Sequence, residues 1–196
     1  FGYADLAAYA IVVCAGVVAW AALASLARNP QPTHATPVPS AAKGWGFTNP
    51  IGFALLSSIQ LIDSACRTGF LTFFPFLLIA KGANVASVGF ALALVFIGGA
   101  AGKLVCGLIA ERVGILRTVI LTELATGMLI AAVVAAPLTW AMLLLIPVGV
   151  ALNGTSSVLY GSVPELVEPA RRARAFSIFY TGTIGSGAVA PAIYGL

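Results

Sequence analysis

Residues 107–117 read Gly-Leu-Ile-Ala-Glu-Arg-Val-Gly-Ile-Leu-Arg. They include the end of one long apolar run and the short polar connection, residues 111–117, that leads to a second apolar run. These runs cover residues 86–110 and 118–136. Glu111, Arg112 and Arg117 crowd into the segment, although charge is scarce elsewhere in the chain. A connection of about seven residues can only join neighbouring antiparallel helices. We therefore predict a helical hairpin with a polar loop at its turn.

The composition indicates that lipid surrounds most of the chain. Of its 196 residues, 60% are hydrophobic and 8% are charged, and the mean hydropathy is +1.04. Soluble domains carry about 25% charged residues, so this chain has too few polar groups to cover a surface in water. The net charge of +4 does not indicate nucleic acid binding, because the basic residues are few and scattered between apolar spans. We predict an all-α, polytopic membrane protein.

Six transmembrane helices are expected. Their approximate ranges are residues 6–27, 51–80, 86–110, 118–136, 141–163 and 173–196. A proline-rich linker at residues 28–50 follows the first span, because five of the eleven prolines fall there. The second span would make a helix of about 45 Å, longer than a hydrocarbon core of about 30 Å. Tilt, protrusion or a break must absorb the excess, and Gly69 and Pro75 offer a place for a break. We expect a turn at residues 137–140, with Trp140 as an interfacial anchor.

The basic residues predict the orientation. One side of the membrane receives seven of them in its connecting segments: Arg28, Lys43, Arg112, Arg117, Arg171, Arg172 and Arg174. The other side receives Lys81 alone. Because cytoplasmic loops carry the excess of Lys and Arg, we place residues 28–50, 111–117 and 164–172 in the cytoplasm and both chain ends outside. The expected location is the bacterial inner membrane.

The polar segment resembles the signature loop of the major facilitator superfamily, Gly-x-x-x-Asp-Arg-x-Gly-x-x-Arg/Lys. Gly107, Arg112 and Gly114 match in spacing, and Glu111 keeps the charge of the Asp that the family usually has. Two apolar residues then stand where basic residues are common, just before Arg117. The resemblance implies a twelve-helix transporter fold.

A second segment supports this resemblance. Gly161, Glu165 and Arg172 form the pattern Gly-x-x-x-Glu followed by six residues and Arg. This pattern is similar to a cytoplasmic motif between the tenth and eleventh helices of sugar-porter members. The resemblance implies that residues 1–27 are the last helix of the amino-terminal half. Residues 28–50 are then the cytoplasmic linker, and residues 51–196 are five spans of the carboxy-terminal bundle. The missing amino-terminal half becomes an expected partner.

Charged and polar residues inside the spans are the candidates for a solute site. A charge in hydrocarbon costs about 2.5–3.5 kcal/mol on insertion scales, so such residues need a partner or a function. Asp63 and Arg67 lie one helical turn apart, near mid-depth of their span. We expect Arg67 to bind an anionic or polar group, and Asp63 to orient it or exchange a proton. A self-neutralising pair that only packs the bundle is the alternative. Asn153 could donate hydrogen bonds to a solute or to another helix.

Lys103 and Glu123 form a second candidate pair. Each lies about six or seven residues, or about 10 Å, along its helix from its end of the loop at residues 111–117, so the two can meet as an ion pair between antiparallel neighbours. A stabilising link and a proton relay are both open interpretations of this pair.

The two loops suggest a cytoplasmic gate. Glu165 could pair with Arg112 or Arg117, and Glu111 could pair with Arg171 or Arg172. Such pairs would form when the cytoplasmic side closes, as the resemblance implies for rocker-switch alternating access. The candidate gate residues are Gly107, Glu111, Arg112, Gly114, Arg117, Gly161, Glu165, Arg171 and Arg172.

The expected function is secondary active transport of a small organic solute, coupled to protons, with export favoured over uptake. The last span is rich in glycine and proline, and looks like the eleventh helix of efflux members. No catalytic cluster, phosphate loop or metal-ligand spacing appears, so we predict no enzyme activity, no cofactor and no metal. Uptake by a symporter or uniporter of the same fold stays open, as does a non-transporting scaffold or receptor. Cys14, Cys66 and Cys106 are expected to be buried free thiols.

Overall fold

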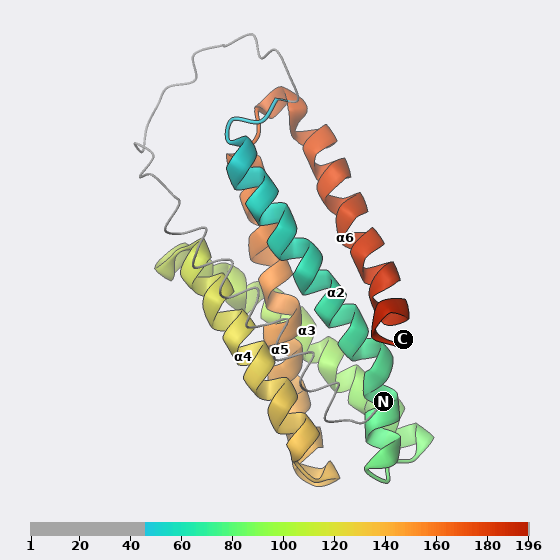
Figure 1. Cartoon of the computed structure of the whole chain (residues 1–196). Coiled ribbons are helices and arrows are strands. Elements are labelled where there is room, and N and C mark those ends of the chain that lie inside the picture. Colours follow the sequence, from blue (N-terminus) through green and yellow to red (C-terminus); the bar gives the residue numbers. More distant parts are fainter. Residues whose placement is uncertain (1–45, 196) are drawn as a thin grey trace.

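The structure is a computed structural model and describes residues 46–195, which form five long helices (Figure 1). The helices are α2 (Pro50–Ala80), α3 (Val85–Val113), α4 (Ile115–Ala135), α5 (Leu138–Ser162) and α6 (Arg172–Tyr194), with the 3₁₀ turns η1 (Val163–Glu165) and η2 (Pro169–Arg171) between the last two. All five are long and apolar enough to cross a membrane. The prediction of an all-helical membrane fold is confirmed for this part of the chain. The predicted first span and residues 28–45 of the linker lie outside the described residues.

The turn between α3 and α4 is much shorter than predicted. Helix α3 continues through Val113 and α4 begins at Ile115, so Gly114 alone forms the turn and the expected loop at residues 111–117 is wrong. Glu and Arg are good helix formers, so the charges of this segment extend the helices instead of breaking them. Gly114 has φ +91°, which costs a residue without Cβ little, and its N–H donates to the carbonyl of Ala110 at 3.0 Å.

Helix α2 is continuous over 31 residues, so the expected break at Gly69 or Pro75 is wrong. The ring of Tyr194 packs against Gly69 and occupies the space that a Cβ would need there, which explains why this position of the helix is a glycine. The helix starts one residue earlier than predicted, because the side chain of Asn49 accepts a hydrogen bond from the N–H of Gly52 at 2.8 Å and Pro50 suits the first helical position.

The turn between α4 and α5 is also shorter than predicted. Helix α5 begins at Leu138, directly after Pro137, so Trp140 lies in its first turn rather than in a loop. The Trp140 side chain is 64% exposed, as expected for an interfacial anchor. Lys81, in the turn between α2 and α3, donates from Nζ to the carbonyl of Val134 at 2.8 Å and thereby caps the end of α4.

Just before α2, the chain is bound to the connection between α5 and α6. Phe47 and Val167 form an isolated antiparallel bridge. The N–H of Glu168 donates to the carbonyl of Gly46 at 3.0 Å, and the N–H of Thr48 donates to the carbonyl of Leu166 at 3.1 Å. The entry to α2 and the entry to α6 are therefore one connected unit.

The helices pack in two groups, and α5 packs closely on both α3 and α4 while α2 packs on α6. Glycines make the contact between α3 and α5 close. A Cβ added at Gly149 would lie 2.9 Å from the backbone nitrogen of Gly99, and it would also collide with the carbonyl of Val95. Small residues are the usual means by which helices approach in lipid, where no hydrophobic effect drives them together.

Hydrogen bonds join the helices of each group. Ser64 Oγ on α2 donates to the carbonyl of Thr183 on α6 at 2.8 Å. Thr155 Oγ1 on α5 donates to Thr122 Oγ1 on α4 at 2.7 Å. Both bonds are buried and join residues far apart in sequence, so they fix the height of one helix against its neighbour.

The buried side chains form two apolar clusters with a polar layer between them. The cluster at the Trp140 end contains Phe70, Phe74, Leu77, Leu78, Ala83, Val88, Ala91, Val95, Ile130, Val133, Ala141, Leu145, Val148 and Leu152. The cluster at the Arg171 end contains Phe53, Leu56, Ile59, Cys106, Val119, Val158, Leu159, Val163, Val167, Ala175 and Phe179. The buried polar layer consists of Gln60, Asp63, Ser64, Thr122, Glu123, Thr126, Thr155, Ser156 and Thr183. Cys66 and Cys106 are buried thiols that form no disulfide, as predicted, and Cys14 lies outside the described residues.

The glycine contact between α3 and α5 can be tested by adding one methyl group. We expect Gly149→Ala to lower the midpoint of thermal unfolding of the purified protein in detergent, because the new Cβ must push the two backbones apart. Overpacking of this kind costs about 1–3 kcal/mol. Gly89→Ala on α3 is the matched control, since its Cβ would meet nothing within 4 Å. Equal midpoints for the two variants would contradict the packing described here.

Candidate functional site

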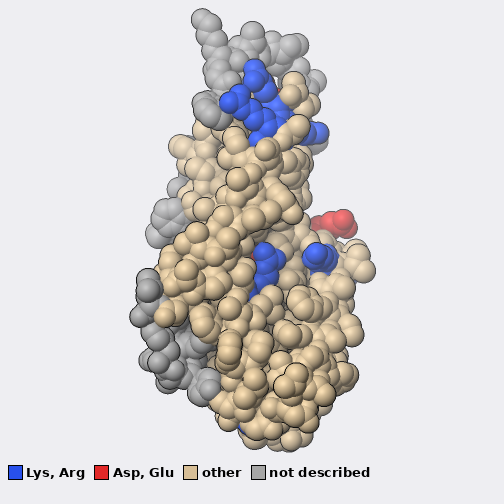
Figure 2. Space-filling view, turned by 90° about the vertical axis from the view of Figure 1, so that its right-hand side faces the viewer, with Lys and Arg blue, Asp and Glu red and all other residues tan. Residues whose placement is uncertain are grey.

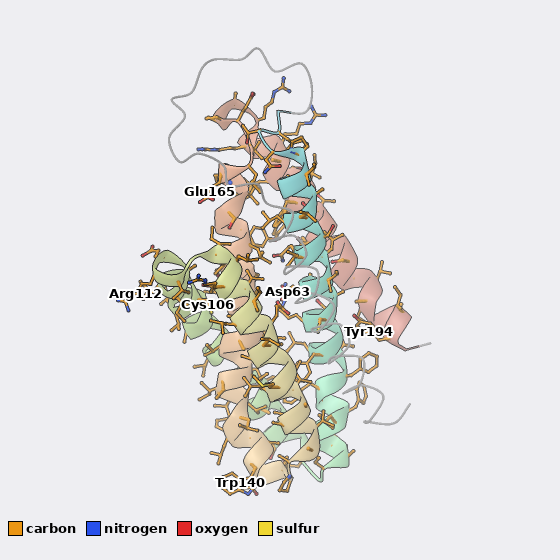
Figure 3. All side chains as sticks on the ribbon, turned by 60° about the vertical axis from the view of Figure 1, so that its left-hand side comes forward. Asp63, Cys106, Arg112, Trp140, Glu165 and Tyr194 are labelled. Atoms are coloured by element: carbon orange, nitrogen blue, oxygen red, sulfur yellow. The ribbon has the colours of Figure 1, made fainter. Side chains whose placement is uncertain are left out.

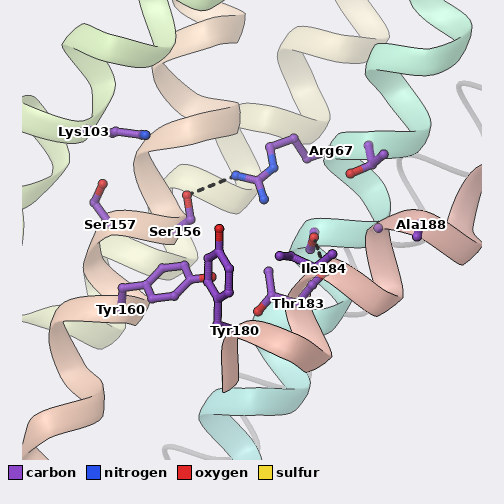
Figure 4. Close-up of a pocket in the computed structure, with 12 residues that line it drawn as sticks. Arg67, Lys103, Ser156, Ser157, Tyr160, Tyr180, Thr183, Ile184 and Ala188 are labelled. Carbon is purple, nitrogen blue, oxygen red and sulfur yellow. Dashed lines mark hydrogen bonds between the residues drawn. The ribbon is translucent and has the colours of Figure 1, made fainter. Parts of the chain in front are cut away.

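A polar pocket of about 640 Å³ lies between the two groups of helices (Figure 4). It is lined from α2, α3, α5 and α6 by Ser64, Arg67, Thr68, Lys103, Ser156, Ser157, Tyr160, Tyr180, Thr183, Ile184, Gly187 and Ala188. Nine of these twelve side chains carry a hydroxyl or a positive charge. This is a high share for a surface in the middle of an apolar bundle, and polar side chains there are the default candidates for a solute site.

Arg67 reaches across the pocket from α2 to α5. Its Nη1 donates to Ser156 Oγ at 3.2 Å, and Ser156 Oγ in turn donates to the carbonyl of Asn153 at 3.0 Å (Figure 4). Arginine has five N–H donors, and this bond uses one of them. The side chain of Arg67 thus lies in the pocket with N–H donors to spare, and its role as a solute-binding residue stays a prediction.

Lys103 faces the same pocket from α3. Figure 4 shows its amine pointing into the space toward which Arg67 also extends. The side chain is exposed, whereas Glu123, its predicted partner, is 2% exposed and does not line the pocket. The ion pair between Lys103 and Glu123 stays a prediction, and the structure assigns Lys103 to the pocket with Arg67.

Asp63 and Glu123 lie together in the buried polar layer. Asp63 is 4% exposed, lies in the middle of the bundle (Figure 3) and has the Glu123 side chain within hydrogen-bonding reach and the Arg67 charge nearby. Two carboxylates contain no donor, so a hydrogen bond between them requires that the pair holds one proton. Sequence spacing predicted the neighbourhood of Asp63 and Arg67 but not this contact between two carboxyl groups.

Asn153 is directed toward α3 rather than into the pocket. Its Nδ2 donates to the carbonyl of Gly149 at 3.3 Å, and its side chain occupies the space that a Cβ on Gly99 would need. Of the two roles considered for Asn153, this geometry favours packing against a neighbouring helix over contact with a solute.

The candidate gate residues are not brought together. Figure 3 shows Glu165, which lies in η1 just after α5, and Arg112 at the α3–α4 turn, with the Arg112 side chain pointing away from Glu165. Arg172 Nη2 donates to the carbonyl of Pro164 at 3.4 Å, and the aliphatic part of Arg171 packs on Gly46. Most of the candidate gate residues are exposed, namely Glu111, Arg112, Gly114, Arg117, Gly161, Glu165 and Arg172. Arg171 is half-buried, and a Cβ added at Gly107 would meet nothing within 4 Å. The gate pairs stay a prediction.

A comparison with protein families agrees with this arrangement. Residues 56–196 match the family model described as Major Facilitator Superfamily. The chain belongs to the Major Facilitator Superfamily. Searches of curated proteins and of solved structures found no match. Membership makes the chain a membrane-embedded helical transporter component, as its resemblance to the family implied, and superfamily members are secondary transporters rather than enzymes.

Most pocket residues escaped the sequence analysis because they are uncharged. The sequence pattern that could have found them is their helical spacing. One face of α6 repeats at intervals of three and four residues and carries Tyr180, Thr183, Ile184, Gly187 and Ala188. Ser64, Arg67 and Thr68, and likewise Ser156, Ser157 and Tyr160, show the same spacing on α2 and α5. Within residues 46–195, no group of three or more His, Cys, Asp and Glu side chains could hold a metal ion.

The contact between the two carboxyl groups predicts a difference between two variants. Glu123→Gln keeps an amide that can donate to Asp63, whereas Glu123→Leu leaves the Asp63 carboxyl group buried without that partner. An unsatisfied buried polar group costs about 1–3 kcal/mol. We expect Glu123→Leu to lower the midpoint of thermal unfolding in detergent clearly more than Glu123→Gln does. If the same two variants in an Asp63→Leu background show the same difference, the contact does not exist.

Proposed function

We propose that this chain forms one half of the pathway of a secondary transporter that moves a small organic solute by alternating access. The pocket at Arg67 carries this proposal. By the helix rise, Arg67 lies about 26 Å from the start of α2 and about 20 Å from its end, so it is near the middle of the span. Transporter sites lie near the bilayer midplane at the interface of two halves. A preceding amino-terminal half would supply the opposite wall of the pocket.

Proton coupling is proposed at the Asp63–Glu123 pair. The pair changes its net charge when it takes up a proton from water that enters the pathway or releases one to it, and Asp63 lies one turn from Arg67, which lines the pocket. A change in the charge of the pair therefore alters the field at Arg67. Because solute binding and proton binding act on the same group of charges, each changes the affinity of the other by the same factor.

The proposed direction is export, and the proposed orientation places the Arg171 end in the cytoplasm. Figure 2 shows basic side chains gathered at the narrow end of the molecule, and further basic side chains at mid-height. Arg171, Arg172 and Arg174 lie at the start of α6, whereas Lys81 lies at the opposite end of the bundle. Cytoplasmic segments carry the excess of Lys and Arg, which supports this orientation. The glycine-rich sequence of α6 supports export.

The gate pair of Glu165 and Arg112 is proposed to form in a second conformation of the transporter, in which the cytoplasmic side is closed. Glu165 and Arg112 point apart here, so a pair between them would need the α3–α4 turn and the end of α5 to approach. Exposed ion pairs contribute about 0.2–1 kcal/mol each, and such weak contacts suit two states of similar energy.

The proton step is tested by Asp63→Asn in the complete transporter. We expect this variant to bind the solute but to lose most of the transport that a pH gradient drives, because its amide cannot exchange a proton. Transport is measured in proteoliposomes with and without an imposed pH gradient. Glu168→Gln removes a carboxylate outside the pocket and is the control. A full response of Asp63→Asn to the gradient would refute coupling at this residue.

The gate is tested by Arg112→Ala. We expect at least a tenfold loss of transport rate with normal abundance in the membrane, because the substitution removes an exposed side chain of the proposed gate. The control is Arg174→Ala, which removes an exposed arginine at the start of α6. Unchanged transport by Arg112→Ala would remove this residue from the gate.

A further inference from the structure

The charge of the pocket defines the class of solute that it accepts. Resting on the transport function proposed above, we propose that the solute is an organic anion with an aromatic body. Its carboxylate is held between Arg67 of α2 and Lys103 of α3.

The twelve residues that line the pocket include two cations and no carboxylate. Arg67 and Lys103 come from different helix groups, and Figure 4 shows both side chains directed into the same space. The pocket therefore presents positive charge from two walls. A guanidinium binds a carboxylate through two parallel N–H bonds, and the lysine amine adds a compact charge from the other side.

The buried carboxyl groups lie outside the pocket lining. Asp63 and Glu123 are 4% and 2% exposed and do not line the pocket, so a solute there cannot contact them. The charged side chains at the pocket surface are therefore those of Arg67 and Lys103 alone. An anion is attracted to this surface, whereas a cation is repelled by it.

The remaining lining suits the rest of such a molecule. Ser157 brings a hydroxyl group that can donate to an anionic oxygen. The rings of Tyr160 and Tyr180 have centroids 6.2 Å apart, and the Tyr180 side chain is 56% exposed, so its ring is open to the pocket. Phe179 holds the Tyr160 ring in an edge-on contact at 5.1 Å. Fixed aromatic faces with one open side favour an aromatic body over a flexible polar one.

The electrical gradient agrees with the proposed direction. The inside of a bacterial membrane is negative, so an anion that leaves the cell moves down the membrane potential. The membrane potential therefore favours export of this class of solute. Proton exchange at Asp63 does not have to drive the anion against the potential.

The test uses three probes of similar size and different charge: 2-naphthoate, 2-naphthamide and 2-naphthylmethylammonium. Binding to the complete transporter in detergent is measured by isothermal titration calorimetry. We expect 2-naphthoate to bind at least tenfold more tightly than the other two. Lys103→Gln should weaken 2-naphthoate binding at least tenfold and leave 2-naphthamide binding unchanged, and Lys103→Arg should restore it. Arg174→Gln removes one positive charge that does not line the pocket and should leave the affinity for 2-naphthoate unchanged.

The proposal is overturned if none of the probes binds, if the amide or the ammonium binds as tightly as the acid, or if Lys103→Gln leaves the affinity for the acid unchanged. Uptake and release of the same probes in proteoliposomes separate this proposal from the transport function. Movement of the amide or ammonium but not of the acid would refute the anion site and keep the transporter. Binding of the acid without any movement would keep the site and refute transport by this pathway.

Discussion

The polar layer inside an apolar bundle is the constraint on which this structure depends. Each intramembrane charge costs about 2.5–3.5 kcal/mol, and water is absent from the surrounding lipid. The protein meets this cost by placing its charges at one height, between an apolar cluster at each end. Asp63 and Glu123 share a contact, Arg67 is bound to Ser156, and hydroxyl groups join the helices around them. The same layer that satisfies the buried charges is therefore the surface from which a binding site can be built.

The two helix groups give this layer its geometry. Helices α3 and α5 are held at close range by glycines, and α2 is held to α6 by the bond from Ser64 to the carbonyl of Thr183. The pocket lies where these groups face each other, so its walls belong to different rigid parts. A change in the position of one group against the other would alter the distance between Arg67 and Lys103 without unfolding either group. This is the kind of movement that alternating access requires.

The sequence predicted the positions of charged residues along their helices better than it predicted which neighbouring side chains they contact. Hydropathy and the rise of a helix placed Asp63 and Arg67 near mid-depth, and Lys103 and Glu123 at a common depth about 10 Å from the turn between their helices, because depth depends on position along a single helix. Which side chain meets which depends on helix rotation and packing. Glu123 reaches Asp63, and Lys103 faces the pocket, although both had been assigned to one ion pair. Charge also gave a false loop at residues 111–117, since Glu and Arg continue a helix up to the single glycine that turns it.

The bridge between Phe47 and Val167 gives the bundle a mechanical property. The chain that precedes Gly46 enters α2 only after it has been fastened to the connection that leads into α6. A pull on the incoming chain is thus divided between two helices instead of acting on one. Helices α2 and α6 carry Arg67, Tyr180 and Thr183. The link between Phe47 and Val167 therefore couples the movement of these two helices, so that one side of the pocket moves as a unit.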